Sequence, residues 1–148
     1  MSKQLETINK ILHLKEQFKE EIEFEVRRMR DQISMLQTRL SLLEEAYTET
    51  QEKYLKKQMA GTLTLQEMGI YQSYLFHLHV ETENRKAEIA RALVALDERH
   101  NALVEAHKEA KLVKTFKERK EKENAKEEMR QERKEMDSIF SMMREVNK

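Results

Sequence analysis

The chain has 148 residues, which is room for one domain of ordinary size. It contains no Pro, no Cys, no Trp and only 2 Gly, and this excludes folds built from many short strands and tight turns. Charged residues make up 38% and hydrophobic residues 39%, as in long amphipathic helices and coiled coils. With 28 basic and 28 acidic side chains, the chain lacks the basic excess that binds nucleic acid or an anionic membrane.

The first predicted helix covers about residues 4–58. From residue 26 its apolar positions alternate by 3 and 4, which is the heptad seam of a coiled coil: Val26, Met29, Ile33, Leu36, Leu40, Leu43, Tyr47, Thr50 and Tyr54. Towards the N-terminus, Val26, Ile22 and Phe18 are separated by two successive steps of 4. The alternation of 3 and 4 then resumes through Lys15, Ile11 and Ile8. We therefore expect a stutter in the seam near residues 18–26.

The turn is expected at about residues 59–69, because both glycines lie there. Gly61 follows the periodic run, as a helix C-cap does. Thr64 is followed three residues later by Glu67, which is the pattern of a capping box at the start of the next helix. Gly69 leaves the start of that helix uncertain by several residues.

The second predicted helix covers about residues 70–146. Its seam also alternates by 4 and 3: Tyr71, Leu75, Leu78, Thr82, Arg85, Ile89, Ala92, Leu96, Arg99, Leu103, Ala106, Ala110 and Val113. Leu93, His100 and His107 offer a neighbouring register, so the pattern alone does not decide which stripe is buried.

The two seams match if the helices fold back on each other. In every expected pair the residue numbers add to 129: Tyr54 with Leu75, Tyr47 with Thr82, Leu40 with Ile89, Ile33 with Leu96, and Val26 with Leu103. The sequence therefore predicts an all-α fold, a long two-helix antiparallel coiled-coil hairpin with an overhanging C-terminal helix. We expect residues 1–148 to form a single coiled-coil domain. A dimer that swaps helices through Gly61 is an alternative.

The overhang has two parts. Residues 117–137 contain 8 basic and 8 acidic side chains, with i, i+4 pairs such as Lys117 with Glu121, and such pairs stabilise an isolated helix. An apolar patch follows at helical spacing, consisting of Met136, Ile139, Phe140, Met143 and Val146. Because the first helix ends short of this patch, we expect Met136, Ile139, Phe140 and Met143 to bind a partner or a second copy.

A second candidate surface lies near the turn. All four tyrosines, Tyr47, Tyr54, Tyr71 and Tyr74, come within two heptads of it, and Phe76 is close by. Tyr47, Tyr54 and Tyr71 fall on the seams and can be explained as packing residues. Tyr74 and Phe76 fall off the seam, where exposed aromatic side chains can anchor a partner.

The residues predict neither catalysis nor a bound metal or cofactor. His77 and His79 lie on opposite sides of a helix, and His100 and His107 are two turns apart, so neither pair can share an ion. There is no phosphate-binding glycine loop, no Cys nucleophile and no serine in a triad context. The sequence shows neither a transmembrane span nor a signal peptide, and we expect a cytoplasmic protein.

Three segments resemble the flagellar export protein family FliJ. They are residues 9–16 (NKILHLKE), residues 65–75 (LQEMGIYQSYL) and residues 134–139 (KEMDSI). The resemblance covers essentially the whole chain in length, in the order of its segments and in the position of the turn.

The resemblance implies a non-enzymatic stalk of the flagellar type III export apparatus, at the cytoplasmic face of the inner membrane. Such a stalk inserts in the hexameric export ATPase, promotes its activity, contacts the export gate protein FlhA and escorts substrate chaperones. The gate would bind near Tyr47, Tyr54, Tyr71, Tyr74 and Phe76, and the ATPase and chaperones at the terminal patch. Two alternatives stay open: the stalk of a virulence type III secretion system, and a structural coiled-coil adaptor or homodimer.

Overall fold

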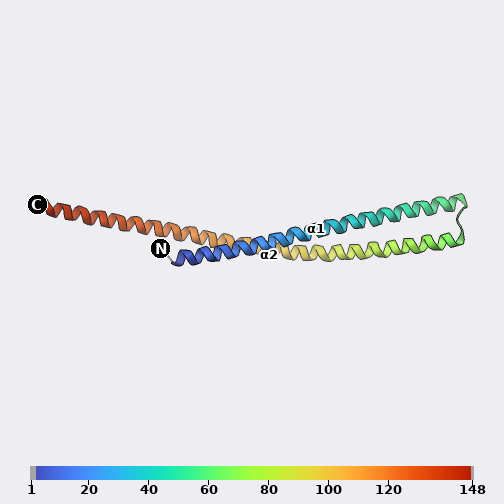
Figure 1. Ribbon diagram of the computed structural model, residues 1–148, viewed down its shortest axis with the longest axis horizontal. Coiled ribbons are helices and arrows are strands. Elements are labelled where there is room, and N and C mark those ends of the chain that lie inside the picture. Colours follow the sequence, from blue (N-terminus) through green and yellow to red (C-terminus); the bar gives the residue numbers. More distant parts are fainter. Residues whose placement is uncertain (1–2, 148) are drawn as a thin grey trace. The chain divides into compact units, whose positions relative to one another are not determined.

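A computed structural model describes residues 3–147. These residues form two helices, α1 (Lys3–Ala60) and α2 (Leu65–Val146), and no strand occurs among them. Figure 1 shows α1 leading into the turn and α2 returning from it in the opposite direction. The predicted fold class, an antiparallel two-helix hairpin, is confirmed.

The turn between the helices comprises residues 61–64, and local hydrogen bonds define both of its ends. Gly61 has φ +69°, a conformation in which a side chain is strained. Its amide donates to the carbonyl of Gln58 at 3.3 Å, and the amide of Thr62 donates to the carbonyl of Lys57 at 3.2 Å. These two bonds form a Schellman motif that ends α1 at Gly61, as the sequence predicts.

The second helix begins immediately after Thr64. The Thr64 hydroxyl accepts a hydrogen bond from the amide of Glu67 at 3.2 Å, so Thr64 is the N-cap. The turn is shorter than the expected span of 59–69, and Gly69 lies inside α2 rather than at a break. Once Thr64 has capped the helix, an internal Gly costs only about 1 kcal/mol, which is too little to end it.

The described residues divide into two units. The turn unit comprises residues 22–102, and the terminal unit comprises residues 3–21 together with 103–147. Each unit contains a segment of both helices, and each is described separately below. The expectation of one domain across the whole chain stays a prediction.

In the turn unit, the buried side chains are those of the predicted seams. The core residues are Ile22, Val26, Ile33, Leu78, Thr82 and Ile89. The neighbouring register is not buried, since Leu93 and His100 are exposed, so the structure selects the seam that starts at Tyr71. Tyr47 and Thr82, one of the expected pairs, line a common groove of about 320 Å³.

Two ion pairs report the alignment of the helices in the turn unit. Lys57 and Glu67 lie 3.6 Å apart next to the turn, and Glu25 and Arg99 lie 2.7 Å apart at the far end of the unit. The residue numbers add to 124 in both pairs. The antiparallel register is therefore constant through the unit.

In the terminal unit, α1 packs through Leu5, Ile8, Leu12, Lys15 and Lys19, all of which are buried or half-buried. The expected stutter is wrong: these positions, together with Ile22 and Val26, keep the 3 and 4 spacing of the rest of the helix. Ile11 and Phe18, which the stutter placed in the seam, are 42% and 52% exposed. A continuous register with α2 outweighs the apolarity of single residues, because lysine can bury its aliphatic stem and keep its ammonium group in water.

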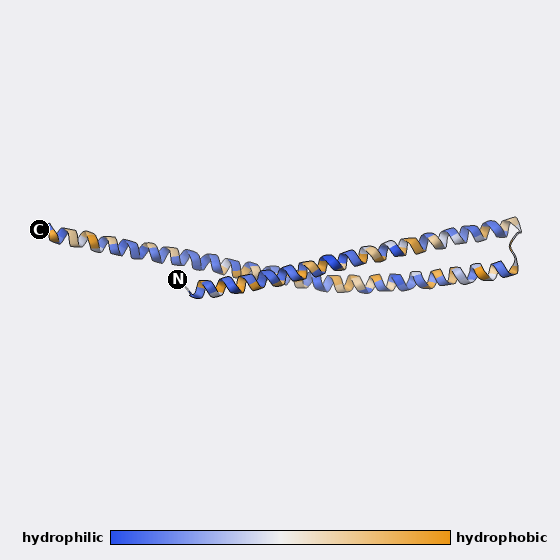
Figure 2. Cartoon of the chain, in the orientation of Figure 1, coloured by the Kyte–Doolittle hydropathy of each residue, from blue (hydrophilic) through white to orange (hydrophobic). Residues whose placement is uncertain are grey.

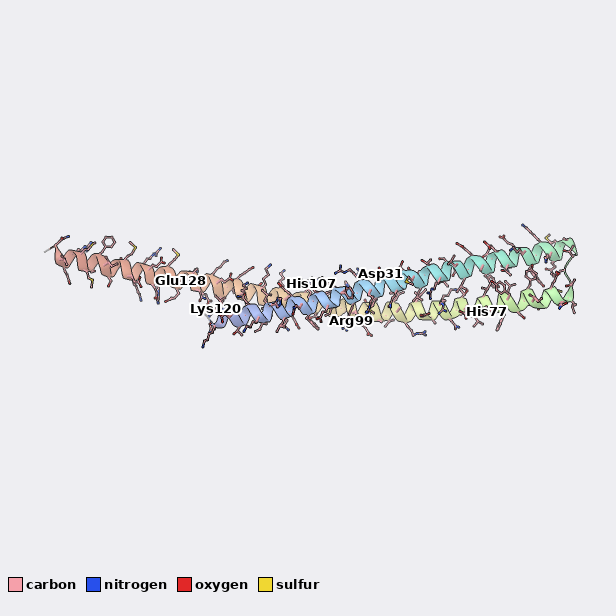
Figure 3. The ribbon with its side chains drawn as sticks, in the orientation of Figure 1. Asp31, His77, Arg99, His107, Lys120 and Glu128 are labelled. Carbon is pink, nitrogen blue, oxygen red and sulfur yellow. The ribbon has the colours of Figure 1, made fainter. Side chains whose placement is uncertain are left out.

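Past the start of α1, the terminal unit consists of α2 alone. Gln4 and Lys120 line the same groove, and every described residue from 125 to 147 is exposed. Figure 3 shows Lys120 beside the first turns of α1 and Glu128 beyond them. The predicted overhang is therefore present as a single, uncovered helix.

Candidate interaction surfaces

The aromatic residues near the turn separate into two groups. Tyr54 and Tyr71 project from α1 and α2 and meet edge to face, with ring centroids 5.6 Å apart. The ammonium group of Lys57 lies 5.5 Å from the centroid of the Tyr71 ring, within range of a cation–π interaction. Tyr47 is also half-buried. These three tyrosines are therefore engaged in packing between the helices.

Tyr74 and Phe76 are the exposed group. Both lie on α2, off the seam, and their side chains are 46% and 68% exposed. Ile70 is one helical turn before Tyr74, and Val80 is one turn after Phe76; both are exposed as well. The structure thus brings only two of the five expected gate residues to the surface. Sequence reasoning missed the exposed neighbours Ile70 and Val80. Their spacing of four residues from Tyr74 and from Phe76 was visible in the sequence.

The terminal patch is exposed in full. Met136, Ile139, Phe140 and Met143 each expose more than half of their side chain, as does Met129, two turns before Met136. In Figure 2 the last turns of α2 carry hydrophobic colour after a mostly hydrophilic stretch. No described residue of α1 lies over them. The expectation of an unpartnered apolar surface at this end therefore fits the structure.

A third apolar surface was not expected. Ile8 and Ile11 of α1 and Leu112 and Phe116 of α2 line a groove of about 430 Å³ in the terminal unit. Leu14 and Phe18 are also exposed on α1. Sequence reasoning missed this surface because the assumed stutter assigned Ile11 and Phe18 to the core.

Ion pairs along the charged segment differ in part from the expected ones. Lys117 and Glu121 lie 3.9 Å apart, as predicted. The i, i+4 pattern also predicts a pair of Arg119 with Glu123, but in the structure Glu123 pairs with Lys120, at 3.8 Å. Glu127 pairs with Arg130 at 3.1 Å. Helical neighbours at i, i+3 and i, i+4 are equally accessible, so the sequence alone does not decide between them.

Two features are absent from the described residues. No three His, Cys, Asp or Glu side chains among them gather closely enough to hold a metal ion. In the same part of the chain, no helix is long and apolar enough to cross a membrane. The geometry provides exposed aromatic residues near the turn and, in the terminal unit, a single helix with exposed apolar residues.

The fold and its surfaces define a coiled-coil hairpin with apolar side chains exposed on both of its units. Residues 3–148 match the family described as flagellar FliJ protein, and the chain belongs to this family. Its members are components of the flagellar type III export apparatus. No curated protein and no solved structure matches the chain.

Proposed function

We propose that this protein is the stalk of a flagellar export ATPase. In this role it inserts in the hexameric ring, promotes ATP hydrolysis, couples the ring to the export gate protein FlhA and escorts unloaded substrate chaperones. It acts in the cytoplasm, at the inner-membrane export apparatus, and needs no cofactor. Membership of the FliJ family supports the association with the export ATPase and export apparatus. We infer from the exposed surfaces which end of the hairpin binds the gate and which end binds the ATPase and the chaperones.

The observation that carries the proposal is the uncovered segment of α2. Residues 125–146 are a single helix with all side chains exposed, including the four apolar residues of the terminal patch. One helix is about 10–12 Å wide, so it fits a narrow central hole better than a two-helix coil does. Residues 117–137 carry 8 charges of each sign, and a net-neutral shaft avoids binding one ring subunit too tightly. We therefore assign this end to the ATPase and the chaperones.

The turn unit supplies the second contact. Tyr74 and Phe76 are exposed, and the packing of the hairpin does not require them. Large aromatic side chains of this kind are the usual anchors of protein interfaces. Tyr74 and Phe76 are two residues apart, so they lie on opposite sides of α2, one on each flank of the seam. We assign both, together with the neighbouring Tyr47, Tyr54 and Tyr71, to the end of the hairpin that meets the gate.

The test is to remove the terminal patch while the hairpin is kept. A chain that ends after Asp137 removes Ile139, Phe140 and Met143, and a full-length variant with Ala at these three positions and at Met136 removes the whole patch. Both should lose stimulation of the purified export ATPase and binding of a purified export chaperone. Fully burying one such side chain is worth about 1.5–3 kcal/mol, so losing three or four should weaken a complex severely.

A matched control changes the opposite face of the same helical turns. Substitution of Lys134, Ser138, Ser141 and Glu145 by Ala keeps the net charge and the helix propensity, and should leave ATPase stimulation and chaperone binding unchanged. If the truncated chain stimulates the ATPase and binds the chaperone as the full chain does, the overhang has no part in either role. Light scattering on the full chain tests the competing hypothesis of a homodimeric spacer, which requires a stable dimer.

A further inference from the structure

The apolar residues of the overhang do not continue the seam of the hairpin. The inner seam of α2 runs through Val113, Lys117, Lys120 and Asn124, and the positions that would extend it, from 127 to 145, are all polar. The apolar residues Met129, Met136 and Met143 lie instead roughly 150° around the helix, at 3.5 residues per turn. Even a longer α1 would therefore leave them uncovered.

These residues belong to a second stripe on the outer side of α2. It begins at Leu112 and alternates by 3 and 4 through ten positions to Met143, so it has the spacing of a coiled-coil seam. Its ten residues are Leu112, Thr115, Arg119, Lys122, Lys126, Met129, Arg133, Met136, Phe140 and Met143. The C-terminal end of the stripe is apolar, the N-terminal end has Leu112 alone, and the part between them is mainly basic. We call these ten positions the outer stripe, and all of them are exposed.

The outer stripe has a one-sided charge in a neutral segment. Residues 117–137 contain 8 basic and 8 acidic side chains, yet four of the bases and none of the acids lie on the stripe. Among the described residues, none of these four bases has an ion pair. Bases off the stripe do pair: Lys117 with Glu121, Lys120 with Glu123, and Arg130 with Glu127. In the structure, the four bases of the stripe are therefore not held in salt bridges within the chain.

We propose that the outer stripe binds an amphipathic helix of another protein, whose facing seam is acidic in its middle heptads and apolar at the end that meets Met136, Phe140 and Met143. The heptad spacing matches a helix laid along α2. The four unpaired bases match carboxylates, and the apolar end of the stripe matches Leu or Met side chains. This inference deepens the proposed function, with which it shares Met136, Phe140 and Met143.

Two other occupants fit less well. A second copy lying antiparallel and centred on Lys126 would place Arg119 opposite Arg133, and like charges that face each other are destabilising. The field of an anionic membrane extends over about 8–10 Å, which is close to the width of a helix, so it also acts on the acidic side chains beside the stripe, and residues 117–137 are neutral as a whole. A partner helix makes its contacts with the stripe. The chemistry of the stripe therefore favours an acidic helix.

The test uses the full chain and two synthetic helical peptides of about four heptads. Both carry Leu at the terminal seam positions; the acidic peptide has Glu in the two central heptads, and the basic peptide has Lys there. Because the chain has no Cys, a fluorophore can be attached at position 126 on the stripe or at position 138 on another face. The acidic peptide should bind at least about tenfold more tightly than the basic one, and should change the signal of the label at 126 but not at 138.

Charge reversal supplies the matched comparison. The variant R119E/K122E/K126E/R133E should lose the acidic peptide and gain the basic one. The control K111E/K114E/K134E/R144E has the same change in net charge on other faces and should keep the original preference. Circular dichroism measures whether both variants are helical. If one of them is not, the preference of the unaltered chain for the acidic over the basic peptide still tests the proposal.

Three results would overturn the proposal: equal binding of both peptides, equal effects of the two reversed variants, or binding to phosphatidylserine vesicles without binding to the acidic peptide. These measurements contain no ATPase, gate or chaperone. A failure here therefore leaves the proposed stalk function standing, and a loss of ATPase stimulation does not bear on peptide binding.

Discussion

Tyr54 and Tyr71 meet across the hairpin with their ring planes at 64° and their centroids 5.6 Å apart. Edge-to-face pairs of this kind contribute about 0.5–1.5 kcal/mol beyond the area that they bury. Tyr71 is the first residue of the α2 seam that the sequence predicts. The contact was not foreseen, because the expected partner of Tyr54 was Leu75. It ties α1 to α2 close to the turn.

A double-mutant cycle measures this contact. We expect Tyr54→Leu and Tyr71→Leu to lower the free energy of unfolding, with a coupling between them of about 0.5–1.5 kcal/mol. Urea unfolding followed by circular dichroism provides the values. As a control, Tyr74→Leu changes an exposed ring and should stay within about 0.5 kcal/mol of the parent. Additive effects of the Tyr54 and Tyr71 substitutions would show that the rings do not interact.

The two glycines should respond to alanine with opposite signs. Gly61 has φ +69° and no atom within 4 Å of an added Cβ, so Gly61→Ala costs only the backbone strain, about 1–2 kcal/mol. Gly69 lies inside α2, and an added Cβ there also meets nothing within 4 Å. Gly69→Ala should therefore stabilise the helix by about 0.5–1 kcal/mol. Thermal unfolding shows for each variant whether the melting temperature rises or falls relative to the parent. A lower melting temperature for Gly69→Ala would contradict the helical assignment of that residue.

The register of α1 in the terminal unit can be tested with two adjacent residues. Leu12 is 9% exposed, whereas Ile11 is 42% exposed. We expect Leu12→Ala to cost about 2–5 kcal/mol and Ile11→Ala clearly less, since only Leu12 leaves a cavity in the seam. Urea unfolding ranks the two. The reverse order would restore the stutter that the sequence pattern predicts.

This pair of residues also explains how far sequence reasoning reaches in this protein. The seam of α2 was recognisable from its 4 and 3 spacing, which is carried mostly by apolar residues from Tyr71 to Val113, but only burial in the structure decided between it and the neighbouring register. The seam of α1 was predictable only from Val26 onwards. Before that point it contains Lys15 and Lys19, and a pattern search that rewards apolarity prefers Ile11 and Phe18. The ion pair of Lys15 with Glu109, 2.9 Å long, joins residues 94 positions apart and is visible only in the structure.

The candidate surfaces were predictable to a similar degree. The terminal patch follows from the length of the chain beyond the turn, because α1 has too few residues to cover it. The outer stripe needs the inner seam as a reference, so it could be recognised only after Asn124 was found to be the last half-buried residue of α2. At the turn, the sequence gathers the aromatic residues, but only burial separates Tyr54 and Tyr71 from Tyr74 and Phe76.

The hairpin should close within one chain. Leu40 and Ile89 belong to the expected facing pairs of the turn unit, and the chain has no natural Cys to interfere. After oxidation, a Leu40→Cys/Ile89→Cys variant should migrate as a crosslinked monomer in a non-reducing gel. A Leu42→Cys/Ile89→Cys variant is the control, because Leu42 is exposed and should crosslink poorly. Crosslinking between chains alone would indicate a dimer that swaps helices through the turn.

The last prediction concerns the surface near the turn. Replacing both Tyr74 and Phe76 by Ala should weaken binding to the cytoplasmic domain of the export gate by about thirtyfold or more, since a buried aromatic anchor is worth about 2 kcal/mol or more. Titration by calorimetry measures the change. The melting temperature should hardly move, because both side chains are exposed and neither belongs to the seam.

A matched variant distinguishes recognition from a general loss of apolar surface. Met35 and Leu42 are 58% and 60% exposed in the same unit, away from the turn along α1, and Met35→Ala/Leu42→Ala should bind the gate as the parent does. If the Tyr74 and Phe76 variant keeps full affinity while its melting temperature falls, these rings support the hairpin and do not dock a partner. If both variants lose affinity equally, the gate does not recognise a surface near the turn, because the loss then follows exposed apolar area wherever it lies.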